Sequence, residues 1–258
     1  MSENVKDISM KEEKDLIKKM ILMVNPGDCR EIRETLNMTE KGTVKNSMEN
    51  YVTVLRKDPL LVGSLRYNRL TEKIDVTKVL WWNKEPCVLT NKGRKALRYF
   101  FEKYYGLFNE SVMDDALDLE AYSKEYHPIC EYLETLEWDG KERIRNVLKV
   151  YMGADDSDMV YEMLKHFMMG ALNRIYCPGC KFDEMLCLVG QQGAGKSTFF
   201  RFLALDDQWF SDSLKNLNME KPYELLRGHW ILEMSEMTAA ISAKSIEAVS
   251  YTHLRAHE

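Results

Sequence analysis

The sequence contains no apolar run of the roughly 18 to 20 residues that a membrane-spanning helix needs. It also lacks a secretory signal, because its first residues, MSENVKDISMKEEKDL, are acidic and polar instead of basic followed by apolar. We therefore expect a cytoplasmic protein that has no membrane partner. The 258 residues carry a formal net charge of −5, which excludes a surface coated with basic side chains but not a local basic groove.

Cysteine and histidine are too sparse to predict a disulfide framework or a zinc site. The six cysteines are scattered along the chain, which favours reduced thiols. Cys177 and Cys180 form a single CxxC, whereas structural zinc needs four ligands, so we predict a turn there and no structural zinc. His253 and His257 are four residues apart, but no obvious third ligand accompanies them. The N-terminal part also lacks the clustered Asp-x-Asp of a primase.

Hydrophobic periodicity predicts a mainly helical α+β region in the first two thirds of the chain. A helix behind the capping box Ser9–Glu12 ends where Asn25–Asp28 reads Asn-Pro-Gly-Asp. His127-Pro128 marks a second break. The pattern predicts a hairpin at 64–76 and helices at 46–55, 90–105, 129–136, 143–152 and 158–176.

Three basic residues, Arg94, Lys95 and Arg98, share a face of the helix expected at 90–105, and Phe101 and Tyr104 lie on its core stripe. A basic stripe beside aromatic residues is one form of nucleic-acid contact. Such charges more often form a solvated helix face, and we favour that interpretation.

A glycine-rich loop carries the strongest chemical signal. Gly190–Ser197 reads GQQGAGKS and matches G-x-x-x-x-G-K-[ST] between an apolar strand expected at Met185–Val189 and a helix expected at Ser197–Ala204. The loop amides would hold the phosphates of a nucleoside triphosphate, Lys196 would reach the β- and γ-phosphates, and Ser197 would bind Mg²⁺. The expected nucleotide-binding residues are Gly190, Gln191, Gln192, Gly193, Ala194, Gly195, Lys196, Ser197 and Thr198.

Two carboxylates follow the next candidate for a buried strand, Trp230–Glu233. A nucleoside triphosphatase places one carboxylate near Mg²⁺ and uses another to orient the attacking water. We assign the metal, through water, to Glu233 and the catalytic water to Glu236, although the two roles exchange if the strand ends a residue or two later. Lys196, Glu233 and Glu236 are therefore the expected catalytic residues.

Several longer runs resemble the virulence-associated protein E family. They are KGTVKNSMENYVTVLRKDP, YNRL, HPICEYLETLEWDGKERI, YCPGCKFDEMLCLVGQQGAGKST, WFSDSL and HWILEMSEM, which together cover roughly residues 41 to 249. The resemblance implies a P-loop ATPase of phages, prophages and other mobile elements, similar to primase-linked helicases. It further implies that ATP and Mg²⁺ are the cofactors, that hydrolysis drives work on DNA, and that the full-length protein forms a homo-oligomeric ring in which a neighbour donates an arginine. The family's acid pair stands at Glu233 and Glu236.

The chain departs from the family after the acidic strand. The family continues with a strand that carries a polar sensor residue, and that strand lies between the loop strand and the acidic strand in additional-strand ATPases. The last nine residues, SYTHLRAHE, do not resemble this continuation and look like translated library-adapter sequence. We therefore expect a truncated chain that binds nucleotide but hydrolyses it poorly.

The expected fold class is α/β, an incomplete P-loop NTPase core of the additional-strand, helicase-like type, preceded by a mainly helical α+β region. A P-loop small-molecule kinase and a non-catalytic, nucleotide-dependent binding module are the alternatives. A kinase would place the acidic strand directly beside the loop strand and would need a lid rich in arginine. The expected parts are a helical extension (1–36), an accessory α+β domain (37–126), a helical lead-in (127–180), a truncated ATPase core (181–249) and a non-native tail (250–258).

Overall fold

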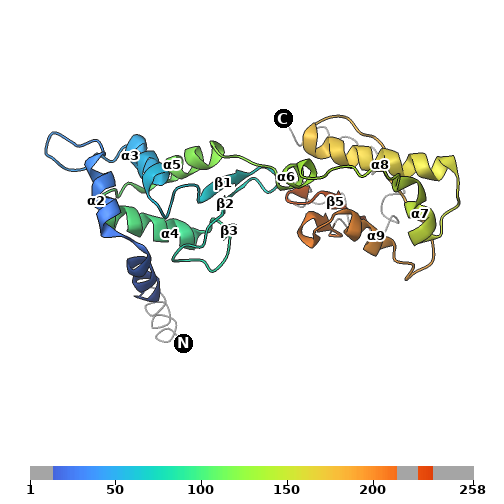
Figure 1. The fold of residues 1–258 in the computed structure, drawn as a ribbon, viewed down its shortest axis with the longest axis horizontal. Coiled ribbons are helices and arrows are strands. Elements are labelled where there is room, and N and C mark those ends of the chain that lie inside the picture. The colour runs from blue at the N-terminus through green and yellow to red at the C-terminus, as the bar shows by residue number, and fades with distance from the viewer. Residues whose placement is uncertain (1–13, 214–225, 235–258) are drawn as a thin grey trace. The chain divides into compact units, whose positions relative to one another are not determined.

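The computed structural model of the chain describes residues 14–213 and 226–234. The chain divides into two compact units, Met1–His127 and Pro128–Glu258 (Figure 1). Each unit has a hydrophobic core. The division falls at the break that His127-Pro128 predicts. In the part of the chain that the structure describes, no helix is both long and apolar enough to span a bilayer.

The first unit combines helices with a small antiparallel sheet of order β1-β2-β3. Residues 14–23 are helical, and the elements that follow are α2 (Pro26–Glu34), α3 (Met48–Lys57), β1 (Leu65–Asn68), β2 (Lys73–Val76), β3 (Cys87–Val88), α4 (Asn91–Phe100), a π-helical turn (Phe101–Tyr105) and α5 (Glu110–Tyr122). The predicted hairpin is confirmed, because Leu65 pairs with Val76 and Asn68 with Lys73. The helices predicted at 46–55 and 90–105 are also confirmed.

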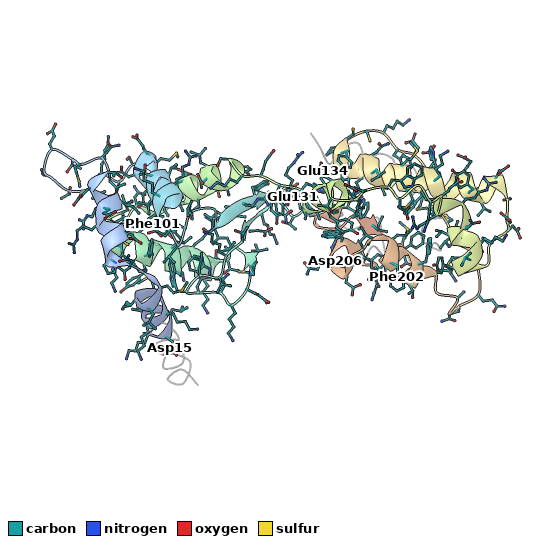
Figure 2. The ribbon with its side chains drawn as sticks, in the orientation of Figure 1. Asp15, Phe101, Glu131, Glu134, Phe202 and Asp206 are labelled. Carbon is teal, nitrogen blue, oxygen red and sulfur yellow. The ribbon has the colours of Figure 1, made fainter. Side chains whose placement is uncertain are left out.

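Aromatic side chains fill the core of the first unit between α3, α4 and α5. Phe101, labelled in Figure 2, and Tyr51 are almost completely buried. Their ring centroids lie 5.1 Å apart in an edge-to-face arrangement. Asp58 is buried in the same core, where it accepts a hydrogen bond from the Tyr105 hydroxyl. Burial raises the pKa of Asp58, although the hydrogen bonds from Tyr105 and from backbone N–H groups oppose that rise.

Helix α2 is an element that the sequence analysis missed. The Asn-Pro-Gly-Asp run that ends the preceding helix also begins the next one. The Asn25 side chain accepts a hydrogen bond of 3.0 Å from the Gly27 N–H as the N-cap, and Pro26 occupies the first helical turn. The same residue types can therefore end one helix and begin another, and only the structure shows that both occur here.

The basic face of α4 is paired with acidic side chains of α5. Arg94 forms ion pairs with Asp114 and Asp118, and Arg98 forms one with Glu110. These pairs support the interpretation of a solvated helix face over a nucleic-acid contact, because neighbouring carboxylates already neutralise two of the three basic groups.

The second unit contains helices and a short parallel strand pair. Its elements are α6 (Pro128–Glu134), α7 (Ile144–Met152), α8 (Asp158–Tyr176), α9 (Lys196–Leu203), a 3₁₀ turn (Asp207–Trp209), β4 (Phe210–Ser211) and β5 (Ile231–Leu232). The predicted helices are confirmed, with ends shifted by no more than two residues. One hydrophobic cluster of this unit is formed by the buried side chains of Leu148 of α7, Leu164 of α8 and Phe199 of α9.

The apolar segment Met185–Val189, predicted as a strand, has no strand pairing in the structure. Leu186 and Leu188 pack against the core of the second unit, whereas Val189 is 98% exposed. The side chains thus alternate between packed and exposed, as they do along a strand. A strand is defined by a ladder of backbone hydrogen bonds, however, and the described residues provide no strand that pairs with this segment.

Candidate functional site

The glycine loop has the backbone conformation that its sequence predicts. Gly193 and Gly195 have φ values of 81° and 79°, in the left-handed region that disfavours residues with a Cβ atom. An added Cβ at Gly190, Gly193 or Gly195 would meet no other atom within 4 Å. Backbone conformation, not crowding, is therefore what requires glycine at 193 and 195. Gly195 is also the N-cap of α9, so the loop leads directly into the N-terminus of a helix.

The ammonium group of Lys196 lies against the loop itself. Its Nζ atom donates hydrogen bonds to the carbonyl oxygens of Gly190 (2.9 Å) and Gln191 (2.8 Å). An ammonium group has three hydrogen atoms, so it can keep both contacts and still donate to an anionic ligand. Gln192, Ala194 and the other residues of the loop are exposed, which leaves it open to solvent.

Ser197 and Glu233 come from elements that are far apart in the sequence, and the structure brings them together. The Ser197 Oγ atom, in the first turn of α9, donates a 2.6 Å hydrogen bond to Oε1 of Glu233. Glu233 directly follows β5, and its backbone N–H donates to the Ser211 carbonyl of β4 at 2.8 Å. The parallel β4–β5 pair therefore sets the position of the carboxylate beside the loop.

These two side chains fit the requirements of a magnesium ion. Oε2 of Glu233 is buried and has no hydrogen-bond partner among the residues that the structure describes. A buried carboxylate oxygen without a partner is costly, and a cation would satisfy it. Mg²⁺ prefers oxygen ligands and takes few from protein when phosphates and water supply the rest. Residues 14–213 and 226–234 contain no cluster of three or more His, Cys, Asp or Glu side chains that could hold a metal, and Mg²⁺ shared with phosphates does not need one.

Helix α8 anchors the acidic strand, a role that the sequence analysis did not foresee. The indole N–H of Trp230, which is 4% exposed, donates a 2.8 Å hydrogen bond to the carbonyl oxygen of Ala171 in α8. The Trp230 backbone N–H donates to the carbonyl oxygen of Trp209, immediately before β4. The guanidinium of Arg174 reaches the carbonyl oxygens of Leu226 and His229. A tryptophan beside a strand was visible in the sequence, but its hydrogen-bond acceptor on α8 was not.

A comparison with protein families identifies a known domain in the second half of the chain. Residues 133–251 match the model of the virulence-associated protein E-like domain. This part of the chain is therefore a virulence-associated protein E-like domain. The glycine loop, Lys196, Ser197 and Glu233 all lie within this domain. A search of the curated proteins finds no match to the chain.

The virulence-associated protein E-like domain begins near the end of α6, so the elements of the first unit lie outside it. Its run PGCKFD, which was part of the resemblance, makes a turn after α8: the Cys180 N–H donates to the Cys177 carbonyl, and Gly179 has a φ of 83°. This confirms the turn predicted for the CxxC. Glu236, the second predicted carboxylate, and the pair His253 and His257 lie outside the described residues.

Thr198 lies at a cavity within the virulence-associated protein E-like domain. This cavity has a volume of about 460 Å³ and lies between α7 and α9. The residues that line it are Val147, Tyr151, Met152, Ala194, Gly195, Thr198, Phe199, Phe202 and Leu203. Ala194, Gly195 and Thr198 belong both to the predicted nucleotide site and to the cavity.

Proposed function

We propose that the virulence-associated protein E-like domain binds ATP with Mg²⁺, as part of a replication protein of a phage or mobile element that hydrolyses ATP. The observation that carries the proposal is the 2.6 Å hydrogen bond between Ser197 and Glu233 next to a glycine loop in its left-handed conformation. A hydroxyl and a carboxylate at the mouth of such a loop form the pair that holds Mg²⁺ in P-loop NTPases. The P-loop NTPase fold of the core is part of the same proposal.

Each residue has a defined task in this proposal. The loop amides and the N-terminus of α9 bind phosphate oxygens, which stabilises their negative charge. Lys196 donates to the terminal phosphates as charge builds there. Ser197 and Glu233 present oxygen atoms toward the metal, and Mg²⁺, when bound, neutralises developing charge on the phosphate oxygens. One of Glu233 and Glu236 orients the attacking water.

Work on DNA, a homo-oligomeric ring, a cytoplasmic location and an arginine from a neighbouring subunit are further parts of the proposal, and they rest on the family. Nothing in the geometry of the loop favours a kinase or a purely regulatory nucleotide site over an ATPase. Turnover by the full-length protein separates the three: phosphate release without an added acceptor supports the ATPase, phosphate transfer to a small molecule supports a kinase, and binding without either supports a binding module.

The test is a titration of the full chain with ATP, in the presence and absence of Mg²⁺. We expect Lys196→Ala to weaken binding about 10- to 100-fold, since a charge-assisted hydrogen bond to phosphate is lost. We expect Ser197→Ala to keep binding without Mg²⁺ but to lose most of the increase in affinity that Mg²⁺ produces. Lys165→Ala is the matched control, because this lysine forms an ion pair with Glu162 on the surface of α8. A wild-type chain that binds no ATP with Mg²⁺ would refute the proposal.

A further inference from the structure

The cavity between α7 and α9 has a firm apolar floor. Phe199 is 7% exposed and belongs to the buried core, and Val147, Met152 and Leu203 pack against that core from both helices. The floor is therefore held in place by the same contacts that stabilise the second unit. A volume of about 460 Å³ lies within the usual range of small-molecule sites, and their walls are typically apolar in the same way.

The rim of the cavity consists of aromatic side chains that are left in solvent. Tyr151, in the last turn of α7, is 74% exposed. Phe202, on α9 and labelled in Figure 2, is 76% exposed. Both line the cavity although they are mostly open to water. Exposed aromatic rings that border an apolar hollow are well suited to stack on a flat ring system.

The cavity adjoins the phosphate loop directly. Gly195 and Thr198 line it, and the same two residues belong to the predicted phosphate-binding set. A ligand that extends from the loop can therefore place its phosphates against the amides and Lys196 while its other end enters the cavity. In a nucleotide, the base lies at the far end from the terminal phosphate, and its flat faces are apolar.

We propose that the base of the bound nucleotide occupies this cavity and is held by stacking and apolar contact, so that the site accepts adenine and guanine with little discrimination. This inference rests on the proposed function. Among the described side chains that line the cavity, only those of Thr198 and Tyr151 carry a polar group, and each is a hydroxyl that can both donate and accept. Strong discrimination between bases requires buried polar groups that remain unpaired with the wrong base. The described residues that line the cavity include no carboxylate or amide side chain that could make that distinction.

The test compares ATP, GTP and inorganic tripolyphosphate as ligands of the full chain by calorimetry, each with Mg²⁺. We expect ATP and GTP to bind within about tenfold of each other, as expected for a site without hydrogen-bonding discrimination. We expect Tyr151→Ala and Phe202→Ala each to weaken both nucleotides about 5- to 100-fold, which is the range for the loss of a stacked base. Tripolyphosphate, which has no base, keeps its affinity in both variants.

Tyr176→Ala is the matched control, because Tyr176 is a half-exposed tyrosine in the last turn of α8 and does not line the cavity. Tyr151→Leu serves where the alanine variant does not fold, since leucine keeps an apolar wall but removes the flat ring. The inference is overturned if the cavity variants weaken ATP no more than Tyr176→Ala does, if they weaken tripolyphosphate equally, or if ATP binds more than a hundredfold tighter than GTP. A wild type that binds neither ATP nor tripolyphosphate overturns the proposed function instead.

Discussion

Gly170, within α8, is the position where adding one methyl group tests most directly how Phe182 packs on this helix. An added Cβ there would lie no farther than 2.8 Å from ring atoms of Phe182. Phe182 belongs to the PGCKFD run that leads from the turn after α8 toward the glycine loop, and its ring stacks on His166 at a centroid distance of 5.2 Å. The absence of a side chain at 170 is therefore what lets this ring pack onto the helix.

Two opposing effects set the magnitude for Gly170→Ala. Alanine in a helix interior is more favourable than glycine by about 0.8 to 1.0 kcal/mol. Because carbon atoms pack at about 3.5 to 4.0 Å, the Phe182 ring would have to move by about 1 Å, and overpacking of this kind costs about 1 to 3 kcal/mol. The steric effect is the larger, so we expect a net destabilisation of about 0 to 2 kcal/mol.

A double-variant cycle isolates the steric effect. Phe182→Leu removes the outer ring atoms that cause the overlap, so Gly170→Ala in that background should stabilise α8 through helix propensity alone, by up to about 1 kcal/mol. Hydrogen exchange of the α8 amides in the full chain, measured for the wild type, both single variants and the double variant, gives the four free energies. The reasoning is wrong if alanine at 170 stabilises α8 in the natural background, or if its effect is the same in both.

Two further predictions concern one residue in each unit. Glu120 is almost fully buried and accepts hydrogen bonds from Arg56 and Lys124; burial alone would raise its pKa, but these two partners outweigh burial and lower it. We expect Glu120→Gln to lower the free energy of unfolding of the first unit by about 1.5 to 3 kcal/mol at pH 7. As the pH falls below about 4, through the lowered pKa of Glu120, this difference from wild type should shrink. Urea unfolding measures it, and a difference that stays constant from pH 7 to 3 would contradict this assignment. Trp230→Phe removes the indole N–H that donates to the Ala171 carbonyl, so we expect a loss of about 1 to 3 kcal/mol in the protection of β5 amides from hydrogen exchange, with no change in α4 as the internal control.

Local chemistry made much of this fold predictable. The helix expected at 158–176 is α8, because a Ser157 N-cap and a continuous apolar stripe depend only on residues within a few turns. The hairpin at 64–76 follows for the same reason. Asn25 shows where local rules are ambiguous: an Asn-Pro-Gly-Asp run ends one helix and begins α2, and both outcomes use the same residue types.

The segment Met185–Val189 shows a second limit of the sequence. Its alternation of packed and exposed side chains is that of a strand, since periodicity is a property of the residues themselves. A strand also needs a ladder of backbone hydrogen bonds, and that ladder requires a second segment alongside the first. A pattern within one segment predicts which face packs, but not whether a partner lies alongside.

The sequence by itself determined the identity of the candidate site: the glycines at 193 and 195, the lysine after them and a carboxylate after an apolar strand. Each depends on residue type and near spacing, which fix backbone freedom and charge. Only the tertiary structure decided that the Ser197 hydroxyl meets the Glu233 carboxylate at 2.6 Å, that Trp230 ties the acidic strand to α8, and that an apolar cavity opens beside the loop. These contacts join residues tens of positions apart, and their geometry is set by how helices and strands pack, which no local pattern specifies.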